Sequence, residues 1–216
     1  MTDRMLAAIG SAFPLTELGC GEYAALKVSG MNFTVRRFAA ENLGSVSVMR
    51  AKGFFGLMKM DTLIITPTQA DMPLLSYDRV LAMGNDTLIF ELYDTLLGEC
   101  DLAVLAAEKE AAASLPDHDL GAHWYDSIKL PVSFAKKGKK QHTAAFDAAT
   151  ERYLAAYLAC AKQAAACESA PKREKAAVYV NGLLEHGGPS TDVFMKGIGK
   201  EKTADLFRRV LFASEA

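Results

Sequence analysis

The chain has 216 residues, and its 24 Lys and Arg nearly balance 26 Asp and Glu, for a formal net charge of −2. Half of the residues are hydrophobic, which is typical of a globular domain with a substantial core. The charge balance argues against a general nucleic-acid binder, and no apolar run reaches the ~18 residues of a membrane span. The apolar part of the N-terminus is too short for a signal peptide. We therefore expect a cytoplasmic protein with no nucleic-acid or membrane partner.

The first hundred or so residues are predicted to form mainly β-strands. The strand-like runs are rich in β-branched and aromatic residues, are bounded by Gly, Asn or Pro, and cover residues 22–28, 32–39, 45–51, 57–65, 78–83 and 87–92. Apolar and polar residues alternate in Phe33–Arg36 and Ser45–Arg50. This pattern is typical of antiparallel strands with one covered face and one more solvent-exposed face. No long helical crossover separates the runs, so a doubly wound parallel sheet is disfavoured.

From Leu96 onward the pattern becomes helical. The expected helices cover residues 97–114, 144–167, 172–186 and 199–212. A turn-rich connection with the only tryptophan, Trp124, and the basic run Lys136–Lys140 separate the first helix from the second. We predict a single α+β domain over residues 1–216, β-rich in 20–95 and helix-rich in 96–216. Three or more helices against one sheet would cover both of its faces.

Neither the cysteines nor the histidines indicate a catalytic or metal site. The four cysteines form no Cys-x-x-Cys pair and have no histidine at metal-ligand spacing. The four histidines are scattered, and no catalytic triad can be recognised. We expect structural thiols and no bound metal.

The stretch Thr66–Asp78 has an acidic side chain near each margin, Asp61 and Asp78. Each has two interpretations: a structural residue of a turn or strand end, or a catalytic acid. An apolar environment disfavours the charged carboxylate and raises its pKa toward neutrality, where the carboxyl group can donate a proton. Apolar residues that can supply such walls are Leu74, Leu75, Met83, Phe90, Met58 and Met60.

Three blocks of sequence resemble the ferredoxin-dependent bilin reductases and their relatives, the red chlorophyll catabolite reductases. The first is the strand ending in Pro67, the Asp71-x-Pro73 loop, and Asp78 five residues after the second proline. The second runs from Trp124 to Lys140 and continues into the helix through Phe146, Tyr153 and Tyr157. The third contains Val193-Phe194, Gly197-x-Gly199 and the terminal Val210-Leu211-Phe212.

The resemblance implies a three-layer α/β/α sandwich with a central antiparallel sheet. It implies an oxidoreductase in which a linear tetrapyrrole lies between the sheet and the C-terminal helices. Electrons arrive singly from an acidic ferredoxin or a similar donor, with no bound flavin, nicotinamide or metal. The proton-donating aspartate of the family corresponds to Asp78, and the family arginine that holds a bilin propionate lies near Lys136 or Lys137.

The chain departs from the family pattern at two places. A family histidine on the preceding strand corresponds to a position at or beside Asp61, which either replaces that histidine or starts a strand on the solvent side. An aspartate that some members use in the C-terminal region corresponds to Gly187-Gly188.

The leading hypothesis is therefore a reductase in which Asp78, with Asp61 as a second candidate, supplies protons. Substrate-binding candidates are Lys136, Lys137, Leu75 and Met60. Two alternatives remain: a non-catalytic tetrapyrrole-binding protein, and a protein that shares only the fold and has another ligand. The basic run Lys136–Lys140 has two further readings, a docking patch for the ferredoxin and a solvated loop around Gly138.

Overall fold

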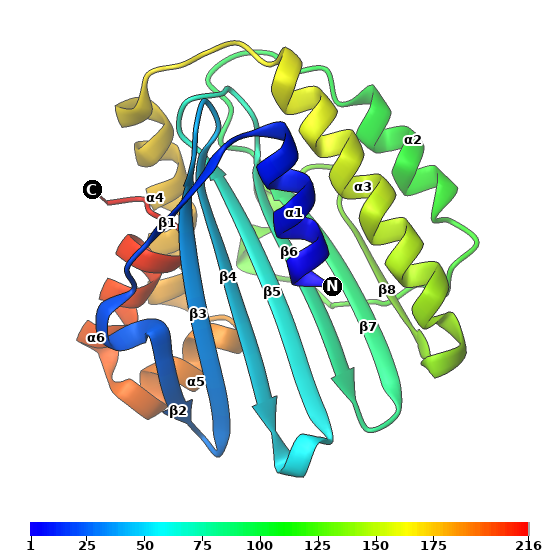
Figure 1. Cartoon of the computed structure of the whole chain (residues 1–216), viewed down its shortest axis with the longest axis vertical. Helices are drawn as coiled ribbons and strands as arrows, with labels where there is room; N and C mark the ends of the chain where they lie inside the picture. Colours follow the sequence, from blue (N-terminus) through cyan, green and yellow to red (C-terminus); the bar gives the residue numbers. More distant parts are fainter. Residues whose placement is uncertain (216) are drawn as a thin grey trace.

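One antiparallel sheet of eight strands forms the middle layer of the computed structural model, which describes residues 1–215 (Figure 1). The strand order is β1-β3-β4-β5-β6-β7-β8, and β2 pairs with β3 beside β1. The strands are β1 (Leu15–Leu18), β2 (Ala25–Val28), β3 (Met31–Ala40), β4 (Gly44–Gly53), β5 (Met58–Pro67), β6 (Leu74–Ala82), β7 (Asn85–Tyr93) and β8 (Phe134–Lys139). This arrangement confirms the predicted α+β fold with a central antiparallel sheet.

Helices cover both faces of the sheet (Figure 1). The first face is covered by α1 (Thr2–Ala12), α2 (Ala103–Ala111) and α3 (Thr143–Gln163). The second face is covered by α4 (Ser169–His186), α5 (Pro189–Ile198), α6 (Lys200–Asp205) and the π-helical turn Leu206–Leu211. Within residues 1–215, no helix is long and apolar enough to cross a membrane.

Side chains alternate between the two faces along each central strand, and the pairing register determines which residues meet. Leu63 of β5 lies opposite Tyr77 of β6, which lies opposite Phe90 of β7, and all three belong to the hydrophobic core of the first face. One residue away, Thr62 lies opposite Asp78 on the second face. Because the side-chain period of a strand is two, residues with neighbouring numbers belong to different cores.

Several elements differ from the sequence-based prediction. Helix α1 was not predicted, although its Met5, Leu6 and Ile9 are buried on one side. Strands β1 and β8 were also not predicted, and β8 contains most of the basic run that had a loop as its alternative reading. Strand β6 begins at Leu74 instead of Asp78, and helix α5 follows directly after the expected stop at Gly187-Gly188.

A buried ion pair joins α4 to the loop between β5 and β6. Lys172 is fully buried, and its Nζ lies 3.2 Å from the Asp71 carboxylate. The same Nζ donates to the backbone carbonyls of Met72 and Thr95, each at 2.7 Å. Burial lowers the pKa of Lys172. The network fixes the start of α4 against the sheet.

Asp71 also explains why the helix predicted from Leu97 begins only at Ala103. Its two carboxylate oxygens accept hydrogen bonds from the backbone amides of Leu97 and Gly98, at 2.9 and 2.8 Å. Burial alone raises the pKa of Asp71, but the bonds from Leu97 and Lys172 outweigh it and lower that pKa. The Asp-x-Pro motif therefore has a structural role in holding this loop.

Candidate functional site

A cavity of about 210 Å³ lies between the second face of the sheet and the C-terminal helices. Its walls are mostly apolar, and they include Met49, Met60 and Ile64 from the strands and Tyr179, Phe207 and Leu211 from the helical layer. Two carboxyl groups, those of Asp78 and Glu91, border this apolar space. An apolar pocket with few convergent polar groups is the usual form of a small-molecule site.

Asp78 reaches the cavity from the middle of β6. Its cross-strand neighbour Thr62 donates a hydrogen bond from its hydroxyl to the Asp78 carboxylate at 2.5 Å. Burial raises the pKa of Asp78 from 3.8 to about 6, the Thr62 hydrogen bond opposes this shift, and the charge of Glu91 adds to it. A carboxyl group with this pKa is partly protonated near neutral pH and can donate a proton to a bound molecule.

Glu91 on β7 supplies the second carboxylate, and it is buried. The Tyr93 hydroxyl donates to its Oε2 at 2.7 Å. Its Oε1 has no hydrogen-bond partner within the described residues, and the Lys129 Nζ lies 3.7 Å away. Glu91 therefore keeps one carboxylate oxygen free to interact with a ligand.

Glu91→Gln is expected to lower the pKa of Asp78, because the substitution removes a nearby negative charge that favours protonation. The pKa can be measured from the carboxyl carbon shift of labelled aspartate as the pH is varied. Glu99→Gln, at an exposed position, is the matched control and should leave this pKa unchanged. An Asp78 pKa that stays the same or rises in Glu91→Gln would contradict the assigned coupling.

The structure brings two of the six candidate residues, Asp78 and Met60, to the cavity. Asp61 does not line it, because it points to the first face between Arg50 and Arg79 of the neighbouring strands. Leu75 is fully buried in the core of that same face.

The two candidate lysines also lie outside this cavity. Lys136 points to the first face, where its Nζ lies 2.5 Å from the Asp117 carboxylate and 3.2 Å from the Leu115 carbonyl. Lys137 is exposed on the edge strand β8. Asp61, Leu75 and the two lysines are therefore not part of the cavity site.

Glu91, His123 and Tyr125 line the cavity, and sequence reasoning did not select them. The alternation along β7 could have identified Glu91. Its neighbours Phe90 and Leu92 pack into the core of the first face, so Glu91 points to the opposite face, where the cavity lies. His123 and Tyr125 come from the connection before β8, and their rings stack with centroids 4.8 Å apart. No local pattern places this connection over the sheet, so their approach could not be predicted.

Comparisons with known proteins find similarity among solved structures. Neither protein-family models nor curated proteins match the sequence. Among solved structures, the fold is similar to that of phytochromobilin synthase from tomato in complex with biliverdin, with a TM-score of 0.80. The match covers 99% of this chain and 82% of that chain at 14% sequence identity. This similarity establishes a shared fold.

Proposed function

We propose that the chain binds a linear tetrapyrrole in the cavity beside Asp78 and reduces it, with Asp78 as a proton donor. The observation that carries the proposal is the position of Asp78, whose raised pKa of about 6 suits proton donation within an apolar cavity. The shared fold supports the choice of ligand, because the similar solved structure contains biliverdin.

Reduction of one double bond takes up two electrons and two protons. We propose that a ferredoxin or a similar one-electron carrier supplies the electrons, as the sequence resemblance implies. Asp78 transfers one proton to the tetrapyrrole after each of the two electrons arrives, and it is reprotonated from solvent between the two transfers. Burial among the apolar walls raises the pKa of Asp78 and keeps it protonated at higher pH, and the negative charge of Glu91 adds to this effect.

The cavity must enlarge to hold a tetrapyrrole. Its volume of about 210 Å³ is below the roughly 300–1,000 Å³ typical of pockets for drug-sized ligands. One wall belongs to the sheet, which is held by continuous backbone pairing between β4 and β7. We therefore expect the C-terminal helical layer to move outward when the ligand binds.

A non-catalytic tetrapyrrole-binding protein is the second candidate. The residue that favours it is Thr62 on β5, the strand on which the family resemblance implies a histidine. Thr62 lies opposite Asp78 of β6, so a threonine is next to Asp78 instead of that histidine. Thr62 bonds to Asp78 and cannot itself supply protons near neutral pH. A bound tetrapyrrole that is not reduced would identify this second function.

Binding can be tested by titrating the protein with biliverdin and recording the visible spectrum. Wild-type protein is expected to change the spectrum at micromolar concentration, whereas Ile89→Trp should weaken binding at least tenfold because it fills the cavity. Val104→Trp, at an exposed position of α2, is the matched control and should bind normally. Equal binding by folded Ile89→Trp and wild type would place the ligand elsewhere.

A further inference from the structure

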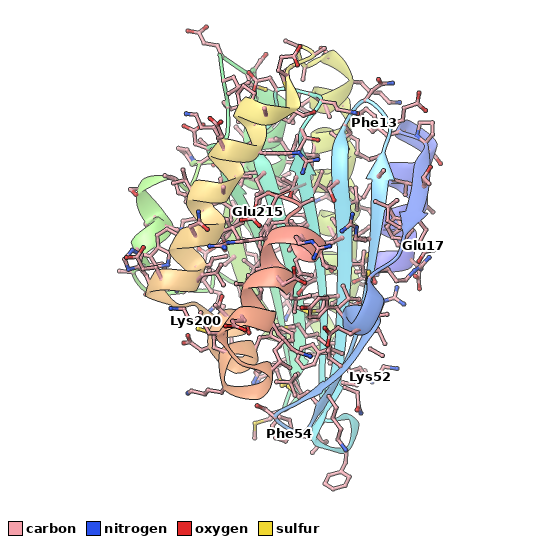
Figure 2. All side chains as sticks on the ribbon, turned by 90° about the vertical axis from the view of Figure 1, so that its left-hand side faces the viewer. Phe13, Glu17, Lys52, Phe54, Lys200 and Glu215 are labelled. Atoms are coloured by element: carbon pink, nitrogen blue, oxygen red, sulfur yellow. The ribbon has the colours of Figure 1, made fainter. Side chains whose placement is uncertain are left out.

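An exposed apolar tip projects from one end of the sheet, where the β4–β5 and β6–β7 turns lie together. The tip consists of Phe54, Phe55, Leu57 and Met83, and Phe55 and Met83 are 109% and 88% exposed. Figure 2 shows Phe54 at the lower extremity of the molecule. The backbone amide of Met83 donates to the carbonyl of Leu57 at 3.4 Å, so both turns contribute to one surface.

The backbone at the tip adopts a conformation that projects these side chains. Phe54, Phe55 and Met83 have φ values of 49°, 54° and 50°, in the left-handed region that bulky residues rarely adopt. Glycine or asparagine is the usual choice at such positions. Large apolar side chains at these positions do not favour folding, because they are exposed and their backbone is strained. We take this as an indication that the tip has a role in binding.

Lysines lie directly behind the tip. Lys52 of β4 and Lys59 of β5 are exposed cross-strand partners, an arrangement in which like charges repel. Lys140 lines the hollow next to Leu57. Within residues 1–215, no carboxylate lies within salt-bridge distance of these three lysines. The lysines are therefore free to contact an external anionic group.

We propose that the tip inserts into the surface of an anionic lipid bilayer, with the lysines contacting the headgroups. Lys52 precedes Phe54 by two residues, so it lies roughly 7 Å behind the tip at about 3.3 Å per strand residue. This offset matches the depth of roughly 5–10 Å at which peripheral proteins bury apolar groups in the membrane interface. A projecting tip suits a deformable lipid surface, whereas a protein partner would need a matching pocket.

This proposal revises the expectation that the chain has no membrane partner. That expectation rested on the lack of a sufficiently long apolar run, which concerns only spanning segments. Peripheral binding needs a small apolar group with nearby cations, and both are present here. The proposal does not depend on the ligand of the cavity.

Sedimentation of the full chain with lipid vesicles tests the proposal. Vesicles of phosphatidylcholine with about 30% phosphatidylserine provide the anionic surface, and pure phosphatidylcholine vesicles provide the comparison. Wild-type protein should bind the anionic vesicles, and binding should weaken as salt is raised. The double variant Phe54→Ser, Phe55→Ser should bind at least tenfold more weakly, and the double variant Lys52→Gln, Lys59→Gln roughly thirtyfold more weakly.

Val178→Ser is the matched control, because Val178 is 63% exposed on α4, away from the tip. Circular dichroism should show that all variants are folded, and this control should bind vesicles as wild type does. Absence of wild-type binding to anionic vesicles, or unchanged binding by the phenylalanine variant, would overturn the proposal. A third outcome would also overturn the proposal. If wild-type protein does not bind vesicles but binds a purified ferredoxin, and the tip variants lose that binding, the tip contacts a protein partner instead.

Discussion

Asp78→Asn is expected to abolish most tetrapyrrole turnover while leaving binding intact, and to make the folded protein more stable at pH 8. Turnover should fall by roughly 10²–10⁴-fold, which is the usual contribution of a positioned acid. Asparagine has nearly the same shape and can still accept the hydrogen bond from the Thr62 hydroxyl. It has no proton to donate near neutral pH. The variant therefore distinguishes an effect on proton transfer from an effect on ligand binding.

The stability effect follows from the raised pKa of Asp78, about 6 in the folded protein against an ordinary value of 3.8. The folded state holds this proton more tightly, so the wild-type protein loses stability as the pH rises from about 4 to about 6. An uncharged asparagine side chain avoids this loss. The free energy of unfolding of Asp78→Asn should therefore exceed that of wild type by roughly 2–3 kcal/mol at pH 8, and by little at pH 4.

Denaturant unfolding of the two proteins at both pH values checks this expectation. Asp119→Asn, at an exposed position, is the matched control and should change stability little at either pH. If Asp78→Asn is no more stable than wild type at pH 8, folding does not raise the pKa of Asp78 in the way described. If turnover is unchanged, Asp78 is not the proton donor.

Lys172→Met is expected to lower the free energy of unfolding by about 3–5 kcal/mol, since it removes one partner of a buried ion pair. The Asp71 carboxylate would lose its cation, and the carbonyls of Met72 and Thr95 would lose their donor without access to water. Methionine fills a similar volume, so the loss reports mainly on the missing charge and hydrogen bonds.

Lys175→Met on the same helix is the matched control, because Lys175 is exposed. Equilibrium unfolding in urea should show a change below about 0.5 kcal/mol for this variant. A Lys172→Met protein within about 1 kcal/mol of wild type would contradict the structural role assigned to the ion pair.

The central strands could be predicted from the sequence because they follow one another as hairpins. Residues 32–39, 45–51, 57–65 and 87–92 were all assigned to strands, and they lie within β3, β4, β5 and β7 except for Leu57. Local alternation and nearby turn residues were sufficient there. By contrast, β1 pairs with β3 and not with the next strand, and β8 pairs with β7 only after a long connection. Local patterns do not specify such partners.

The candidate site depended on register, which sequence patterns did not provide. Asp78 and, as a second candidate, Asp61 were both proposed as proton donors, but Asp61 pairs opposite Arg79, and Thr62 pairs opposite Asp78. A shift of one residue would exchange the faces of these side chains. Leu75 was a candidate wall residue, and the predicted strand started only at Asp78. Its start at Leu74 places Leu75 and Asp78 on opposite faces.

The most direct test of the central claim is the absorption spectrum of biliverdin bound to the wild-type protein during anaerobic reduction by photoreduced ferredoxin. We predict that the long-wavelength band bleaches or moves to shorter wavelength, and that the bound ligand in Asp78→Asn changes at least a hundredfold more slowly. A bound tetrapyrrole whose spectrum stays unchanged in the wild type would contradict the reductase and favour the non-catalytic binding protein. Absence of any spectral change on mixing would contradict both functions.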